Sequence, residues 1–149
     1  MFSFLGLLAL ALLSAPSVMA GKLIVQNNCK FDIWCDAAKN DGSSSASVRV
    51  PAGNHYTSPL PANNDNVGAV LKCTDTSGSQ KKFQEELAVQ NGRSWFDLSA
   101  IDGDPFINYH RHAEIAGQCV LDCPAGSTAC YYPKQVDCLT TQDAVLTLC

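Results

Sequence analysis

The sequence predicts an all-β domain, a sandwich or a barrel, that is held together by disulfide bonds. Short apolar segments alternate with clusters of Asn, Asp, Gly, Ser and Pro, and no segment has the periodicity of a convincing helix. The chain of 149 residues contains eight cysteines, and an even count behind a secretory signal indicates four disulfides rather than thiolate chemistry. The cysteine spacings are also wider than those of a zinc knuckle.

The first twenty residues are predicted to be a signal peptide. They carry no charged side chain, and the apolar run from Leu5 to Leu13 is too short to span a bilayer. Val18 and Ala20 are small residues at the positions that a signal peptidase reads, so we expect cleavage before Gly21. A transmembrane anchor is the alternative. The chain is thus divided into a signal peptide, residues 1–20, and one mature domain, residues 21–149, which we expect to be secreted and free of the membrane after cleavage.

Segments with the length and composition of strands follow one another along the mature domain. They are residues 22–26, 31–34, 48–50, 67–71, 83–90, 94–98, 107–109 and 145–148. The stretch between Cys119 and Cys138 is expected to be a disulfide-held loop region.

The dipeptide Asn91-Gly92 predicts a type I′ turn and with it the register of a hairpin. If Gln90 opposes Arg93, then Glu86 opposes Asp97. One face of this hairpin is apolar and is expected to join the core: Leu87, Val89, Phe96 and Leu98. The opposite face carries polar residues and an indole: Glu86, Gln90, Arg93, Trp95 and Asp97. Two opposed carboxylates repel each other, and Arg93 or the hydroxyls of a ligand are candidates to offset that cost.

The formal net charge of −4, without a basic cluster beyond Lys81-Lys82, excludes nucleic acid as an expected partner. Neutral or cationic partners such as sugars fit this charge better. His110, His112 and Glu114 are potential metal ligands on one face of an extended segment, but no fourth ligand is evident. We therefore expect an exposed strand face or loop there, with neither a metal nor a cofactor. Residues 102–105, Asp-Gly-Asp-Pro, lack the ligand count of a calcium loop and predict a turn.

Three stretches spread over the mature chain have a recognisable pattern. Residues 27–34 read NNCKFDIW, residues 96–103 read FDLSAIDG, and residues 144–149 read AVLTLC. They resemble the first strand, the central strand and the closing strand of the thaumatin family. The resemblance is strongest to its small fungal branch, the antigenic thaumatin-like or yeast-phase-specific proteins. It implies a small thaumatin-like β-sandwich that lacks most of the disulfide-rich second domain.

The resemblance also implies a disulfide pattern that the cysteine count alone leaves open among 105 possibilities. The implied pairs are Cys29 with Cys149, Cys119 with Cys138, Cys123 with Cys130 and, by remainder, Cys35 with Cys73. Plant members of the family have an acidic cleft, linked to β-glucan binding, of one Arg, one Glu and three Asp. Glu86 resembles the Glu, Asp97 and Asp102 resemble two of the Asp, and Lys72 stands near the position of the Arg.

From these residues we expect a secreted, monomeric, non-enzymatic protein that binds cell-wall carbohydrate of the β-glucan type. Trp95 between two carboxylates suits a sugar ring and its hydroxyls, unless it packs under a loop. The expected binding residues are Glu86, Asp97, Asp102, Trp95, Arg93 and Lys72. One alternative is an effector or antigen that engages a host protein. Another is a weak β-1,3-glucanase, which we disfavour because a small fold is poorly placed to raise the pKa of one carboxyl by burial.

Overall fold

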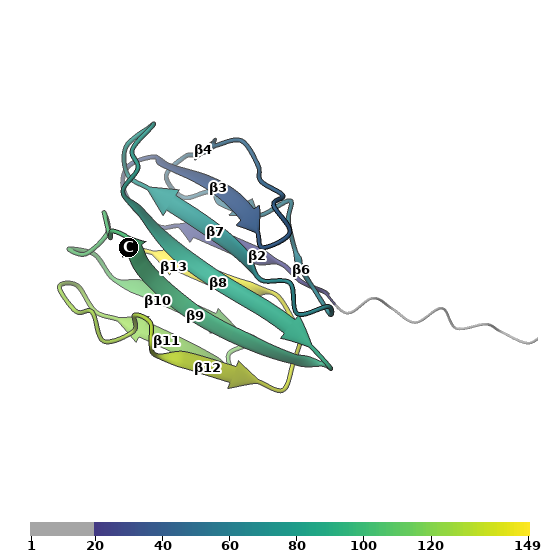
Figure 1. The fold of residues 1–149 in the computed structure, drawn as a ribbon. Coiled ribbons are helices and arrows are strands. Elements are labelled where there is room, and N and C mark those ends of the chain that lie inside the picture. The colour runs from purple at the N-terminus through teal and green to yellow at the C-terminus, as the bar shows by residue number, and fades with distance from the viewer. Residues whose placement is uncertain (1–19) are drawn as a thin grey trace, which may run out of the picture.

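The computed structural model describes residues 20–149, which form a β-sandwich of two sheets with a small two-stranded ribbon beside them (Figure 1). The strands are β1 (Ala20–Gly21), β2 (Leu23–Asn27), β3 (Ile33–Lys39), β4 (Val48–Val50), β5 (His55–Thr57), β6 (Ala62–Asn63), β7 (Ala69–Thr74), β8 (Lys82–Gln90), β9 (Arg93–Asp102), β10 (Arg111–Ile115), β11 (Cys119–Cys123), β12 (Gln135–Cys138) and β13 (Ala144–Leu148). This range contains no helix, and hence none long and apolar enough to cross a membrane. The predicted signal peptide lies outside the described residues except for Ala20.

The two sheets are built from strands that are far apart in the sequence. One sheet has the order β11-β10-β13-β2-β5, the other has the order β12-β9-β8-β7-β3-β4, and β1 pairs with β6. The pairs are antiparallel except for β13 with β2, which run parallel. Figure 1 shows the long β8–β9 hairpin crossing the middle of the six-stranded sheet, with β10, β11 and β13 in the layer behind it.

The core lies between the sheets because their strands bury every second residue. β2, β10 and β13 each alternate buried and half-buried side chains along their whole length. In the β8–β9 hairpin the predicted apolar face is buried as expected, with Leu87, Val89, Phe96 and Leu98 all at most 2% exposed. The predicted turn and register are confirmed, since Asn91 and Gly92 both have positive φ and Glu86 pairs with Asp97.

All four implied disulfides are present. Cys29–Cys149 joins the last residue to the loop after β2, and Cys35–Cys73 links facing residues of β3 and β7. Cys119–Cys138 connects β11 with β12, which are the edge strands of different sheets. This bridge therefore closes one side of the sandwich covalently.

Two sequence expectations about strands are wrong. Residues 107–109 lie in a turn, and the strand begins only at Arg111. The stretch from Cys119 to Cys138, expected to be a loop, contains β11 and β12. The sequence does not predict β10 because one of its buried positions is an arginine. The buried residues are Arg111, Ala113 and Ile115, and the arginine interrupts the apolar alternation that marks a strand in the sequence.

Arg111 can be buried because the loops around it neutralise and hydrogen-bond its guanidinium. Its Nε lies 3.1 Å from Oδ2 of Asp104, and its terminal nitrogens donate to backbone carbonyls of Ile107, Tyr109, Pro124 and Ser127. The hydroxyl of Tyr131 donates to the same Asp104 carboxylate. The side chain thus ties the loops before β10 and after β11 together.

Candidate functional site

A groove of about 440 Å³ lies on the outer face of the six-stranded sheet. Its lining residues come from strands β3, β7, β8, β9 and β12, from Asn40 directly after β3, and from the loop between β6 and β7. The sequence pointed to four of them, namely Lys72, Glu86, Trp95 and Asp97. The groove is hollow because short side chains lie among these longer ones, at Ala38, Gly68 and Ala88.

The strand register determines which side chains are neighbours in the groove. Glu86 on β8 faces Asp97 on β9, and Asp97 faces Gln135 on β12. Val70 on β7 lies on the other side of Glu86. One row across the sheet therefore brings two carboxyls and an amide together. Trp95 lies two residues before Asp97 on β9, so it is on the same face of the sheet, and it is half-buried. The half-buried indole lines the groove.

Asp97 is the electrostatically unusual group of this row. The residue is only 8% exposed, and burial followed by the neighbouring charge of Glu86 raises its pKa to about 7. Its Oδ1 is buried and has no hydrogen-bond partner. The expectation that a small fold is poorly placed to raise the pKa of a carboxyl by burial is thus wrong for Asp97, which lies between Glu86 of β8 and Gln135 of β12.

Arg93 and Asp102 lie outside this groove. Arg93 is paired at 3.5 Å with Asp137 of β12, so it does not neutralise Glu86 or Asp97. Asp102 lines a second hollow of about 280 Å³ next to the groove. Its Oδ2 accepts hydrogen bonds from Lys72 at 3.3 Å and from Gln84 at 2.7 Å. Lys72 lines both hollows and therefore separates the Asp102 carboxylate from the carboxyl pair.

Sequence reasoning missed several lining residues and one core carboxyl. Gln135 belongs to β12, where the sequence predicts a loop. Asp36 pairs with Lys82 at 2.6 Å, and both residues line the second hollow. Glu85 is fully buried, neither of its carboxyl oxygens has a hydrogen-bond partner, and burial raises its pKa well above its ordinary value. Period-two alternation was a signal for Glu85, since it shares the inward face of β8 with Leu87.

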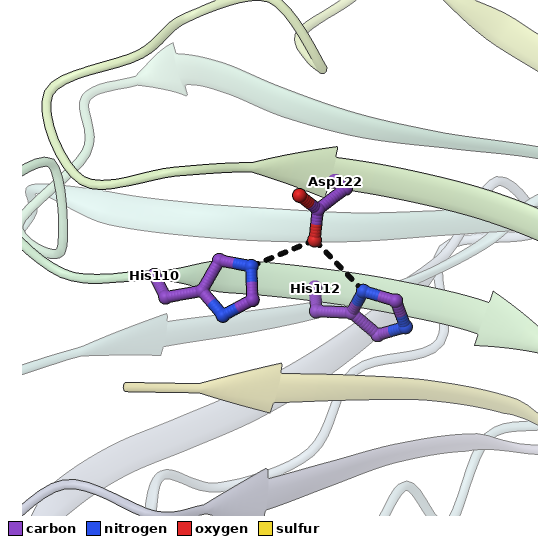
Figure 2. A group of neighbouring side chains, drawn as sticks. All are labelled: His110, His112 and Asp122. Atoms are coloured by element: carbon purple, nitrogen blue, oxygen red, sulfur yellow. Dashed lines mark hydrogen bonds and ion pairs between the residues drawn. The ribbon is translucent and has the colours of Figure 1, made fainter.

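A different polar cluster lies on the outer face of the five-stranded sheet. The side chains of His110, His112 and Asp122 offer ligand atoms that all lie within 4.8 Å of one another (Figure 2). Hydrogen bonding to Asp122 raises the pKa of His112, and hydrogen bonds from His112 and His110 lower the pKa of Asp122. Among residues 20–149 this is the group of His, Cys, Asp and Glu side chains that can hold a metal ion. Glu114, the third ligand candidate from the sequence, contacts only His112.

Comparison with known proteins places the chain in a family and a fold. Residues 10–149 match the sequence profile of the family described as Bys1, Blastomyces yeast-phase-specific protein. Among curated protein sequences there is no match.

Two solved structures are similar over nearly their full lengths. The protein elicitor MoHrip2 from Magnaporthe oryzae has a TM-score of 0.76 and 20% identity, covering 87% of this chain and 99% of its own. The thaumatin-like xylanase inhibitor TLXI has a TM-score of 0.64 and 13% identity, covering 85% of this chain and 98% of its own. At such low identities the likeness shows the fold, which is the thaumatin-like sandwich expected from the sequence.

Proposed function

The chain belongs to the Bys1 family of Blastomyces yeast-phase-specific proteins, and on that premise we propose that it is a secreted, monomeric, non-enzymatic domain that binds cell-wall carbohydrate of the β-glucan type. The binding surface is the groove on the six-stranded sheet. Four disulfides support secretion, because such bonds persist in oxidising compartments and are rare in the cytosol. Neutral sugars also suit a surface with a net charge of −4 better than anionic polymers do.

The observation that carries the proposal is the placement of Trp95 beside the Glu86–Asp97 pair in one open groove. A half-buried indole that lines the groove offers apolar surface to the CH groups of a pyranose ring. A carboxyl pair in which Asp97 holds a proton up to about pH 7 contains both an acceptor and a donor. Sugar hydroxyls also donate and accept, so each ring could be held by stacking and by hydrogen bonds at once.

The same pair is poorly arranged for hydrolysis, although Asp97 has the raised pKa of a general acid. Glycoside hydrolases place two carboxyls on either side of the scissile bond. Glu86 and Asp97 are direct cross-strand neighbours on one sheet face, so both approach a bound sugar from the same side. This geometry favours binding without cleavage.

The test is co-sedimentation of the purified, tag-free protein with insoluble β-1,3-glucan and with chitin as a second polymer. We expect the wild type to sediment with glucan and Trp95→Ala to bind roughly tenfold more weakly, because stacking on the indole is lost. Trp34→Ala is the matched control, since Trp34 is a half-buried indole on β3 of the same sheet but outside the groove. Unchanged sedimentation of Trp95→Ala would refute the proposal. Release of reducing sugar that disappears in Glu86→Gln would instead indicate the glucanase.

A second candidate function is engagement of a host protein as an effector or antigen. It is favoured by the similarity in fold to an elicitor and to a xylanase inhibitor. Affinity capture from host secreted proteins, run in parallel with the glucan assay, separates the two: a specific protein partner together with no glucan binding would select this alternative.

A further inference from the structure

The outer face of the five-stranded sheet carries two histidines and a carboxylate that converge on one point. His112 lies in β10 and faces Asp122 directly across the β10–β11 pair. His110 precedes β10 by one residue and lies two positions before His112, so both rings share the outward face. Figure 2 shows both imidazoles directed at the carboxylate of Asp122.

Both imidazoles lie within hydrogen-bonding distance of the same carboxylate oxygen. A single oxygen, Oδ1 of Asp122, lies 2.7 Å from Nε2 of His110 and 2.9 Å from Nδ1 of His112. The three donor atoms lie within 4.8 Å of one another, and metal–ligand bonds of about 2.0 to 2.2 Å span such a set after small side-chain rotations. The side chains of His110 and His112 are 53% and 30% exposed, so these rotations are not blocked by packing.

Glu114 orients His112 in the way that a metal-ligating imidazole requires. The Nε2 of His112 lies 3.4 Å from Oε2 of Glu114, and its Nδ1 faces Asp122. When Nε2 donates its hydrogen to Glu114, Nδ1 presents a lone pair toward the Asp122 carboxylate. Without a metal ion a proton lies between Nδ1 and Oδ1, which are 2.9 Å apart, and a bound cation replaces this proton.

The backbone that carries these ligands is held on several sides. β10 lies between β11 and β13, and β11 begins and ends at disulfide-bonded residues, Cys119 and Cys123. Strand register therefore fixes the spacing of His112 and Asp122 before any ion arrives, so little ordering entropy is lost on binding.

We propose that His110, His112 and Asp122 form a binding site for one divalent transition-metal ion, with Glu114 as the positioning residue of His112. Two imidazoles and one carboxylate select borderline metals over calcium or magnesium, in the order Cu²⁺ before Ni²⁺ and Zn²⁺. Solvent supplies the remaining ligands, because the cluster lies at the surface. The site is on the sheet opposite to the carbohydrate groove and does not depend on the proposed function.

The test is isothermal titration of tag-free, disulfide-intact, chelator-treated protein with CuCl₂, NiCl₂ and ZnCl₂. We expect one Cu²⁺ per chain, tighter than Ni²⁺ and Zn²⁺, and an electron paramagnetic resonance spectrum of Cu²⁺ with nitrogen ligands. His112→Gln and Asp122→Asn should each weaken binding by at least about tenfold, and Glu114→Gln by about tenfold through loss of the ring's orientation.

The remaining histidine is a matched control. His55 lies on β5, at the opposite edge of the same sheet, so His55→Gln should bind like the wild type. Circular dichroism and thermal unfolding without metal verify that each variant is folded. Absence of binding below millimolar concentrations, or equal loss in His55→Gln and His112→Gln, would overturn the proposal and leave an ordinary surface ion-pair cluster. Tight binding that persists in both His112→Gln and Asp122→Asn would overturn it as well.

Discussion

Glu85 provides the sharpest test of the structure, because it places a carboxyl in the core without a partner. The residue is 0% exposed and both oxygens lack a hydrogen bond. Its neighbours on the adjacent strands are Leu71 and Leu98, which are also fully buried. Burial raises the pKa of this carboxyl well above its ordinary value of 4.5, so the folded protein holds it in the neutral form.

The pH dependence follows from the proton that folding must take up. The unfolded chain loses the Glu85 proton near pH 4.5, whereas the folded chain keeps it. The stability contribution is therefore complete below the ordinary pKa and is lost as pH rises toward the folded value. As pH rises above 4.5, this proton progressively lowers the free energy of unfolding, until the folded protein releases it as well.

Two substitutions separate the charge from the missing hydrogen bonds. Glu85→Gln cannot ionise, so its stability relative to wild type should rise steadily as pH increases above 4.5, with little difference at the acidic end. Glu85→Leu removes the unpaired oxygens as well and should be about 1–3 kcal/mol more stable than Glu85→Gln at every pH. Urea unfolding followed by tryptophan fluorescence, with disulfides intact, measures both. A stability difference between Glu85→Gln and wild type that does not change with pH would refute the neutral, unpartnered carboxyl.

Three further perturbations test other parts of the fold. Asp97→Asn should remove a loss of stability that develops in the wild type as pH rises from 3.8 to about 7, roughly 2 kcal/mol once half of the full shift is discounted for solvent screening; parallel pH curves for the two proteins would contradict this. Replacing both Cys29 and Cys149 by serine opens a link between residues 120 positions apart and should cost about 4–5 kcal/mol in urea unfolding, whereas an unchanged midpoint would deny the bridge a role. Arg111→Met should lower the free energy of unfolding by roughly 3–5 kcal/mol, because it leaves the buried Asp104 carboxylate without its partner. Adding Asp104→Asn should recover part of that stability in thermal unfolding, and no recovery would argue against the ion pair.

The β8–β9 hairpin shows how much of the structure the local sequence predicts. Asn91-Gly92 determines the turn, the turn determines the register, and the register places Glu86 opposite Asp97. The sorting of Leu87 and Phe96 into the core follows from alternation alone. What could not be predicted was the environment of Asp97, because its raised pKa depends on β12, a strand that the sequence did not reveal.

The proposed metal site and the groove contain residues that the local sequence does not bring together. His110 and His112 were visible as neighbours on one strand face, but Asp122 joins them only through the pairing of β11 with β10. Gln135 likewise reaches the groove through the pairing of β12 with β9. The turn between β10 and β11 contains a lone glycine, Gly117, rather than the Asn-Gly pair of the β8–β9 hairpin, and β12 reaches β9 from a distant part of the chain.

The amino-acid sequence by itself determined the all-β class, the hairpin register and, through family resemblance, the disulfide partners. Only the tertiary structure decided which carboxyls are buried, which of the predicted polar residues share a groove, and where the third residue of the proposed metal site lies. The physical reason is range: turn geometry and period-two alternation act over a few residues, whereas the choice of neighbouring strands is made by the packing of the whole core.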